Sequence, residues 1–214
     1  AYMNRSLYPV GKSVNWLPNS DKYLFSDSKN PNNLMIQDVN TEKAEVFITL
    51  DQVNSYLNQA GLDSIKRLPN LTWIDATKAY YYSFDQKNNC VNLNLLNINA
   101  NNIKKVTSIP SNAENHTITL PSLKVAYTIE NNLYFADGEK HVQVTDNPEN
   151  VVAGQSVHRN EFAINGGIFW SPDGNKLAYY NMDESMVTDY PLVDITERVA
   201  TAKPIKYPMA GMKS

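Results

Sequence analysis

Short apolar stretches recur along the chain, and each combines a tryptophan- or proline-containing turn with a run of aromatic and branched residues. The four stretches are NWLPNSDKYLF from Asn15, LTWIDATKAYYYSF from Leu71, LPSLKVAYTIENNLYFAD from Leu120 and FWSPDGNKLAYYNMDE from Phe169. Alternation of apolar and polar positions with a period of two indicates β-strands. The stretches lie about 45 to 57 residues apart, and periods of ~40–50 residues with several short strands in each are typical of β-propeller blades.

The third stretch shows the strand pattern in most detail. HTITL, KVAYTIE, NLYFAD and HVQVT are four strand-length runs, separated by Pro121, Asn131-Asn132 and Asp137-Gly138. Asn-Asn and Asp-Gly pairs between alternating runs indicate β-hairpins, and Pro172 and Gly174 suit a tight turn in the fourth stretch. A β-sandwich also has many short strands, but here the pattern recurs with the same internal order. We therefore predict an all-β chain of about four propeller blades.

One segment, TLDQVNSYLNQAGLD, departs from the strand pattern. Its apolar residues fall on one face of a helix, namely Leu50, Val53, Leu57 and Ala60. Thr49 suits the N-cap, Asp51 stabilises the positive helix N-terminus, and Gly61 stands where a C′ residue belongs. We predict one short helical insertion between the first two blades.

The composition narrows the range of functions. The 214-residue chain has a formal net charge of −3, which gives no electrostatic drive toward nucleic acid or an anionic membrane. Its one cysteine, Cys90, and its three dispersed histidines leave no pattern for a multi-residue metal site. The sequence has no G-x-S-x-G elbow and no phosphate-binding glycine loop. We expect no cofactor, no metal, no nucleic-acid partner and no catalytic residue in this chain.

The most specific segment begins at Val157 and reads VHRNEFAINGGIFWSPDGNKLAYYNMDESMVTDYPLVD, followed by KPIKYPMAGMKS. Its H-R-x-E-F stretch, W-S-P-D-G turn, M-D-E-S-x-V and Y-P-x-A-G together resemble the bacterial dipeptidyl peptidase IV family, in the prolyl oligopeptidase clan of serine peptidases. The resemblance spans residues 1–214 and implies that they form the N-terminal part of an eight-bladed propeller. It also implies a catalytic α/β-hydrolase domain outside this chain, so we expect a fragment that is inactive alone.

The resemblance further implies an activity, its partners and its location. Family members release N-terminal dipeptides, or tripeptides in a close subgroup, after proline or alanine, and the propeller gates access to the active site. The expected partners are a peptide with a free N-terminus and a penultimate Pro or Ala, the hydrolase domain of the same polypeptide, and a second copy in a homodimer. The implied location is periplasmic, secreted or in the cell envelope.

Glu161 matches the family's motif for binding the substrate's N-terminus. A carboxylate there would hold the α-ammonium by a charge-assisted hydrogen bond, and its distance from the scissile bond would set how many residues leave. Arg159 shares a face with Glu161 if the segment is extended, and would orient the carboxylate or contact the substrate. Asn160 stands where many members have a second glutamate, so the choice between dipeptide and tripeptide release stays open.

Two other functions remain open at this point. A binding-only periplasmic or surface propeller would have no hydrolase domain and would give Glu161 no special role. A propeller glycosidase would need two acids that converge on the central channel, and the candidates are Asp183, Glu184 and Asp189.

Overall fold

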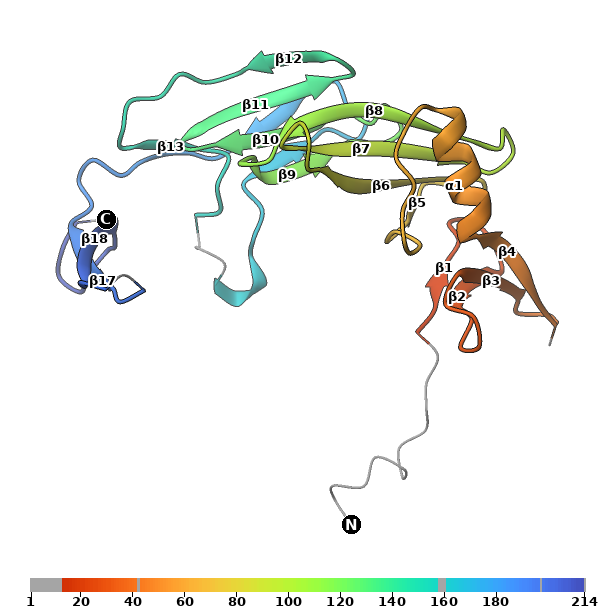
Figure 1. The fold of residues 1–214 in the computed structure, drawn as a ribbon. Helices are drawn as coiled ribbons and strands as arrows, with labels where there is room; N and C mark the ends of the chain where they lie inside the picture. Colours follow the sequence, from red (N-terminus) through yellow and green to blue (C-terminus); the bar gives the residue numbers. More distant parts are fainter. Residues whose placement is uncertain (1–12, 42, 158–160, 197, 214) are drawn as a thin grey trace. The chain divides into compact units, whose positions relative to one another are not determined.

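The computed structural model describes residues 13–41, 43–157, 161–196 and 198–213. These residues form antiparallel β-sheets and one α-helix, which confirms the predicted all-β class (Figure 1). The chain divides into two compact units, Ala1–Ser111 and Asn112–Ser214. Each unit contains its own sheets.

The first unit holds two four-stranded antiparallel sheets, each with its strands in chain order. The first sheet consists of β1 (Asn15–Trp16), β2 (Lys22–Ser26), β3 (Asn33–Asp38) and β4 (Ala44–Thr49). The second sheet consists of β5 (Thr72–Trp73), β6 (Lys78–Asp85), β7 (Cys90–Asn97) and β8 (Asn102–Pro110). Four strands in up-and-down order are the unit from which propellers are built, so the first two predicted blades are confirmed.

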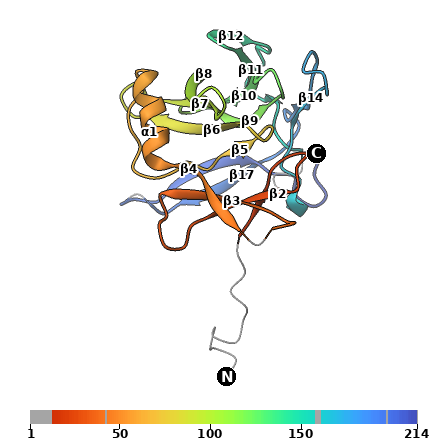
Figure 2. The same cartoon turned by 90° about the vertical axis from the view of Figure 1, so that its right-hand side faces the viewer.

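Helix α1 (Leu50–Gln59) follows β4 directly, as the sequence predicts. The Thr49 side chain accepts a hydrogen bond from the Gln52 backbone N–H, and the Gln52 side chain accepts one from the Thr49 N–H, which completes a capping box. At the other end Gly61 adopts a φ of +69° and closes the helix. Figure 2 shows the helix alongside the sheet β5–β8, and it contacts β8 and β4.

The buried side of α1 joins the cores of these two sheets. Val53, Tyr56 and Leu57 pack in one cluster with Ile48 of the first sheet. The same cluster contains residues of the second sheet, namely Tyr81, Leu96 and Ile103. A ten-residue helix is marginal by itself, so this packing is what stabilises the insertion.

The second unit contains the third four-stranded sheet, in the order β12-β11-β10-β9. Its strands are β9 (Glu114–Ile118), β10 (Val125–Ile129), β11 (Asn132–Asp137) and β12 (Lys140–Gln143). The four predicted runs are therefore confirmed, but the first hairpin turn lies one residue earlier than predicted. Ile129 pairs with Asn132, so the loop is Glu130-Asn131. The Asn132 side chain instead accepts hydrogen bonds from Thr145 Oγ1 and the Asn147 N–H.

The fourth predicted blade differs from a four-stranded sheet. Its strands form two-stranded pairs, β13 (Val151–Ala153) with β16 (Asn181–Asp183), and β14 (Ile168–Trp170) with β15 (Leu177–Tyr179). A separate hairpin consists of β17 (Asp189–Asp194) and β18 (Thr201–Lys206). The core of the second unit joins Ala126 and Leu133 of the third sheet to Ala153 and Ile168, with Trp170 packed against them.

Candidate functional site: an inserted loop with a tight neck

The segment that carries the predicted site is inserted into a strand. β13 and β14 pair in succession with one stretch of chain, because Ala153 pairs with Asn181 and Ile168 pairs with Tyr179. The chain therefore leaves the sheet after Ala153 and rejoins it at Ile168, two positions further along the same partner strand. Loops of this length whose ends lie close together are frequently functional.

Backbone hydrogen bonds to Tyr180 hold the two ends of the loop together. The Tyr180 N–H donates to the Gly167 carbonyl over 3.0 Å, and the Tyr180 carbonyl accepts from the Gly154 N–H over 2.8 Å. Slightly further out, the Ser156 hydroxyl donates to the Ile164 carbonyl over 2.6 Å. These three bonds define the neck of the loop.

The neck is also sterically tight. A methyl carbon added at Gly167 would lie 2.3 Å from the carbonyl carbon of Gln155 and 2.6 Å from the carbonyl oxygen of Gly154. Both distances are far below van der Waals contact, and both atoms belong to the backbone. The approach of the two backbone segments therefore requires glycine at position 167.

Of the two residues that the sequence singled out, Glu161 lies between the ends of this loop. Glu161 begins a short 3-10 turn, η2 (Glu161–Ala163). Arg159 lies outside the described residues. The pairing of Arg159 with Glu161, and the role of both in binding a substrate amine, therefore stay predictions.

The structure adds Phe162, which the sequence analysis did not single out. Its side chain is 90% exposed, an unusual environment for a large apolar ring directly beside the candidate acid. Phe162 and Ala163 have φ values of 53° and 60°, the left-handed region that non-glycine residues enter at a cost of about 1–2 kcal/mol each. The only signal in the sequence was an aromatic residue next to an acid in a loop.

Two of the acids of the glycosidase alternative, Asp183 and Asp189, make local contacts. The Ser185 side chain, and then its backbone N–H, hold the pKa of Asp183 below its usual range, whereas a general acid needs a raised pKa. Asp189 pairs with Lys206 at 3.0 Å. Glu184 directly follows β16, and its backbone N–H donates to the Asn150 carbonyl.

Within the described residues, no cluster of three or more histidine, cysteine or carboxylate side chains could hold a metal ion. Over the same residues, no helix has the length and apolar character to cross a membrane.

Comparison with known proteins identifies relatives over nearly the whole chain. The family model described as "Dipeptidyl peptidase IV (DPP IV) N-terminal region" matches residues 68–214. "Probable dipeptidyl-aminopeptidase B" of Phaeosphaeria nodorum is 28% identical over 242 residues, covering 95% of this chain and 26% of that protein. Its namesake in Pyrenophora tritici-repentis is 32% identical over 132 residues, covering 50% of this chain and 15% of that protein.

Solved structures agree with the sequence relatives. A "putative dipeptidyl aminopeptidase IV" from Bacteroides ovatus has a TM-score of 0.73 and 37% identity, over 95% of this chain and 28% of that one. Porphyromonas gingivalis dipeptidyl peptidase 4 shares the fold, with a TM-score of 0.60 and 18% identity over 95% of this chain and 30% of that one. This chain thus spans at most 30% of the length of these relatives. With the family model matching more than half of its residues, and with blade-type sheets in both units, the chain belongs to the dipeptidyl peptidase IV family, within that family's N-terminal region.

Proposed function

We propose that this chain is the non-catalytic propeller portion of a serine-type exopeptidase that releases N-terminal dipeptides or tripeptides, and that it gates the active site and binds the substrate's free N-terminus. The observation that carries the proposal is the inserted loop, whose neck is held by Tyr180 and which contains Glu161. The names of the relatives, dipeptidyl aminopeptidases and peptidases, support the same activity. The hydrolase domain of the same polypeptide would supply the chemistry.

Glu161 would act by charge and by position. A carboxylate that accepts a hydrogen bond from the substrate ammonium gains about 1.5–3 kcal/mol. Because the amine is remote from the scissile carbonyl, this binding energy orients the carbonyl for attack. Arg159 would orient the carboxylate, and Phe162 would offer the first substrate side chain an apolar contact.

Kinetics of the full-length protein test the proposal. With X-Pro nitroanilide substrates, Glu161→Gln should lower kcat/KM by about tenfold to a hundredfold, while Glu139→Gln, in an exposed turn, should leave it unchanged. Acetylation of the substrate's amine should have an effect of similar size on the unaltered enzyme and little further effect on Glu161→Gln. Equal turnover of free and acetylated peptides would refute the anchoring role.

A binding-only propeller is the alternative, and the same protein distinguishes it. Full-length protein that hydrolyses no X-Pro or X-Ala peptide, with or without a free amine, would favour a binding role. The proposed periplasmic, secreted or envelope location is tested by fractionation of cells that express the native gene, where recovery in the cytoplasm would contradict it.

The proposed homodimer would use the β17–β18 hairpin. A two-stranded sheet buries neither face by itself, and several large side chains of this hairpin are more than half exposed, namely Leu192, Val193, Ile195 and Val199. Pro191 pairs with Pro204, and proline offers no N–H to an added strand, so a second copy would pack on a face. Val193→Ser should shift the full-length protein to monomer in analytical ultracentrifugation, and an unchanged oligomeric state would refute this.

A further inference from the structure

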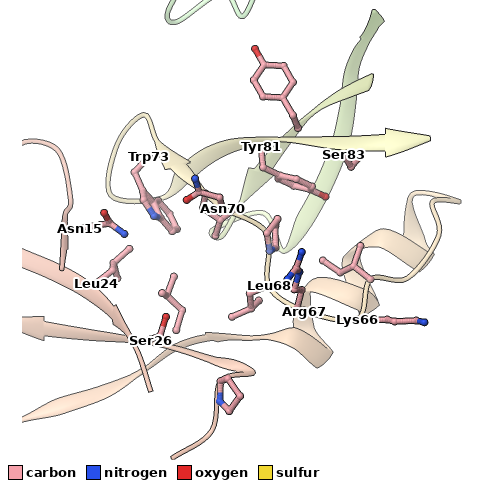
Figure 3. Close-up of a pocket in the computed structure, with 16 residues that line it drawn as sticks. Asn15, Leu24, Ser26, Lys66, Arg67, Leu68, Asn70, Trp73, Tyr81 and Ser83 are labelled. Atoms are coloured by element: carbon pink, nitrogen blue, oxygen red, sulfur yellow. The ribbon is translucent and has the colours of Figure 1, made fainter. Parts of the chain in front are cut away.

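A cavity of about 850 Å³ lies between the sheets β1–β4 and β5–β8 of the first unit. Figure 3 shows the sixteen residues that line it. Its wall combines apolar and polar side chains, with Leu24, Leu68 and Trp73 among the apolar ones, and its lining contains two cations, Lys66 and Arg67, and no carboxylate. In a chain with a formal net charge of −3, this is a locally positive and partly apolar site, of the size of ordinary ligand pockets.

The segment that carries the two cations is anchored to helix α1. The Asn54 side chain makes two hydrogen bonds with the Ile65 backbone, donating to its carbonyl over 3.1 Å and accepting from its N–H over 2.8 Å. The Ser64 hydroxyl donates to Asn58 Oδ1. Lys66 and Arg67 follow immediately, and within the described part of the chain neither makes an ion pair. An anchored backbone thus presents two cations that have no carboxylate partner among the described residues.

Tyr81 provides a second and independent indication of a ligand. Its side chain is 2% exposed, and its hydroxyl is buried without a hydrogen-bond partner among the described residues. Buried polar groups are normally paired, and an orphan calls for an explanation. Figure 3 shows the Tyr81 ring on the same side of β6 as Arg67 and Leu68. Burial raises the pKa of the phenol to about 12, so the hydroxyl remains a donor at physiological pH.

We propose that this cavity binds a small carboxylate with an apolar body. The Arg67 guanidinium would hold the carboxylate, for which its planar fork of donors is suited, and rotation of its exposed side chain would admit the ligand. One carboxylate oxygen would accept the orphan Tyr81 hydroxyl proton in a hydrogen bond. The apolar body would pack on Leu24, Leu68 and Trp73. This site does not depend on the peptidase proposal, since none of its residues lies in the inserted loop.

A carboxylate on an apolar body occurs at the C-terminus of a peptide and in a fatty acid. Calorimetric titration of the full-length protein with N-acetyl-Leu-Leu and with octanoate distinguishes the two. The acetyl group removes the free amine, so binding of the dipeptide cannot be attributed to Glu161. N-acetyl-Leu-Leu-amide has the same body without the charge and is the matched ligand control.

We expect at least one of the two acids to bind, and the amide to bind at least tenfold more weakly. Arg67→Gln should weaken binding of that acid about tenfold to a hundredfold, while Arg198→Gln, at an exposed site in the other unit, should not. Tyr81→Phe should weaken it several-fold, whereas Tyr80→Phe, on the opposite face of β6, should leave it unchanged. Binding of neither acid, equal binding of acid and amide, or unaltered affinity in Arg67→Gln would each overturn the proposal.

Discussion

Replacing Gly167 by alanine should open the neck of the inserted loop. The added methyl would overlap the backbone of Gln155 at 2.3 Å from its carbonyl carbon, so one of the two backbone segments must move by about 1 Å to restore ordinary contact. Overpacking of this kind costs typically 1–3 kcal/mol. Because the clash is with backbone and not with a flexible side chain, we expect a loss of about 3 kcal/mol.

The displacement should affect substrate recognition more than the chemistry. If Glu161 holds the substrate amine, a shift of about 1 Å at the base of its loop should lower kcat/KM about a hundredfold for peptides with a free N-terminus. Peptides with an acetylated N-terminus make no such contact, so their slow turnover should hardly change. The ratio of kcat/KM for free peptides to kcat/KM for acetylated peptides therefore reports the position of the loop, and it does not depend on the amount of folded protein.

Gly166→Ala is a matched control in the same loop. Its added methyl would meet only the Phe169 ring, at 3.4 Å, which is an ordinary contact. We expect this variant to keep its melting temperature. We also expect it to keep the ratio of kcat/KM for peptides with a free N-terminus to kcat/KM for acetylated peptides. Gly167→Ala should melt at a lower temperature than the unaltered protein. An unchanged melting temperature would show that the close approach to Gln155 is absent, and an unchanged ratio would show that the neck does not position the amine-binding group.

Other predictions concern the stability of the two units. Thr49→Ala removes the side-chain half of the capping box and should lower the free energy of unfolding by about 1 kcal/mol, whereas full retention of stability in denaturant titration would show that the cap contributes nothing. Burial raises the pKa values of Tyr81 and Tyr82 to about 12, above the ordinary value near 10. The folded state therefore keeps protons that the unfolded chain releases, and stability should fall between pH 10 and pH 12 by about 1.4 kcal/mol per pH unit for each phenol. Calorimetry at pH 9 and pH 11 should detect this loss, and Tyr81→Phe should reduce it. Ala163→Gly relieves a left-handed residue and should raise the melting temperature by a few degrees, so a lower value would contradict the backbone assignment. Trp170→Ala removes a half-buried ring from the core of the second unit and should cost about 2–3 kcal/mol; loss of substrate binding at an unchanged melting temperature would contradict its placement there.

Features that depend on neighbouring residues could be predicted from the sequence. Helix α1 begins after Thr49 and ends before Gly61 as expected, because capping hydrogen bonds join residues only a few positions apart. The same applies to Gly174, whose φ of +66° completes the turn that the S-P-D-G motif indicates. The positions of the strands followed from alternation, which reports which side chains share a face.

The register of the strands, and the strand with which each one pairs, were harder to predict from the sequence. The hairpin turn at Glu130-Asn131 was placed one residue late, because the Asn-Asn signal does not say which asparagine enters the strand. The fourth stretch was expected to form one blade, yet its strand over residues 177–183 pairs first with β14 and then with β13. Alternation identifies a strand but not its neighbours, so the sequence could not show that residues 154–167 are an insertion.

The sequence by itself determined the all-β class, the capped helix and, through a resemblance in the segment after Val157, the family and its candidate acid, Glu161. Tertiary structure decided how the loop of that acid is held at Gly167, and why the Tyr81 hydroxyl, buried between two sheets, has no hydrogen-bond partner among the described residues. The physical reason is the same in both cases. Helix caps and turns are specified by contacts within a few residues, whereas a loop neck or a buried orphan hydroxyl depends on which distant segments meet, and these segments are joined only when the sheets pack.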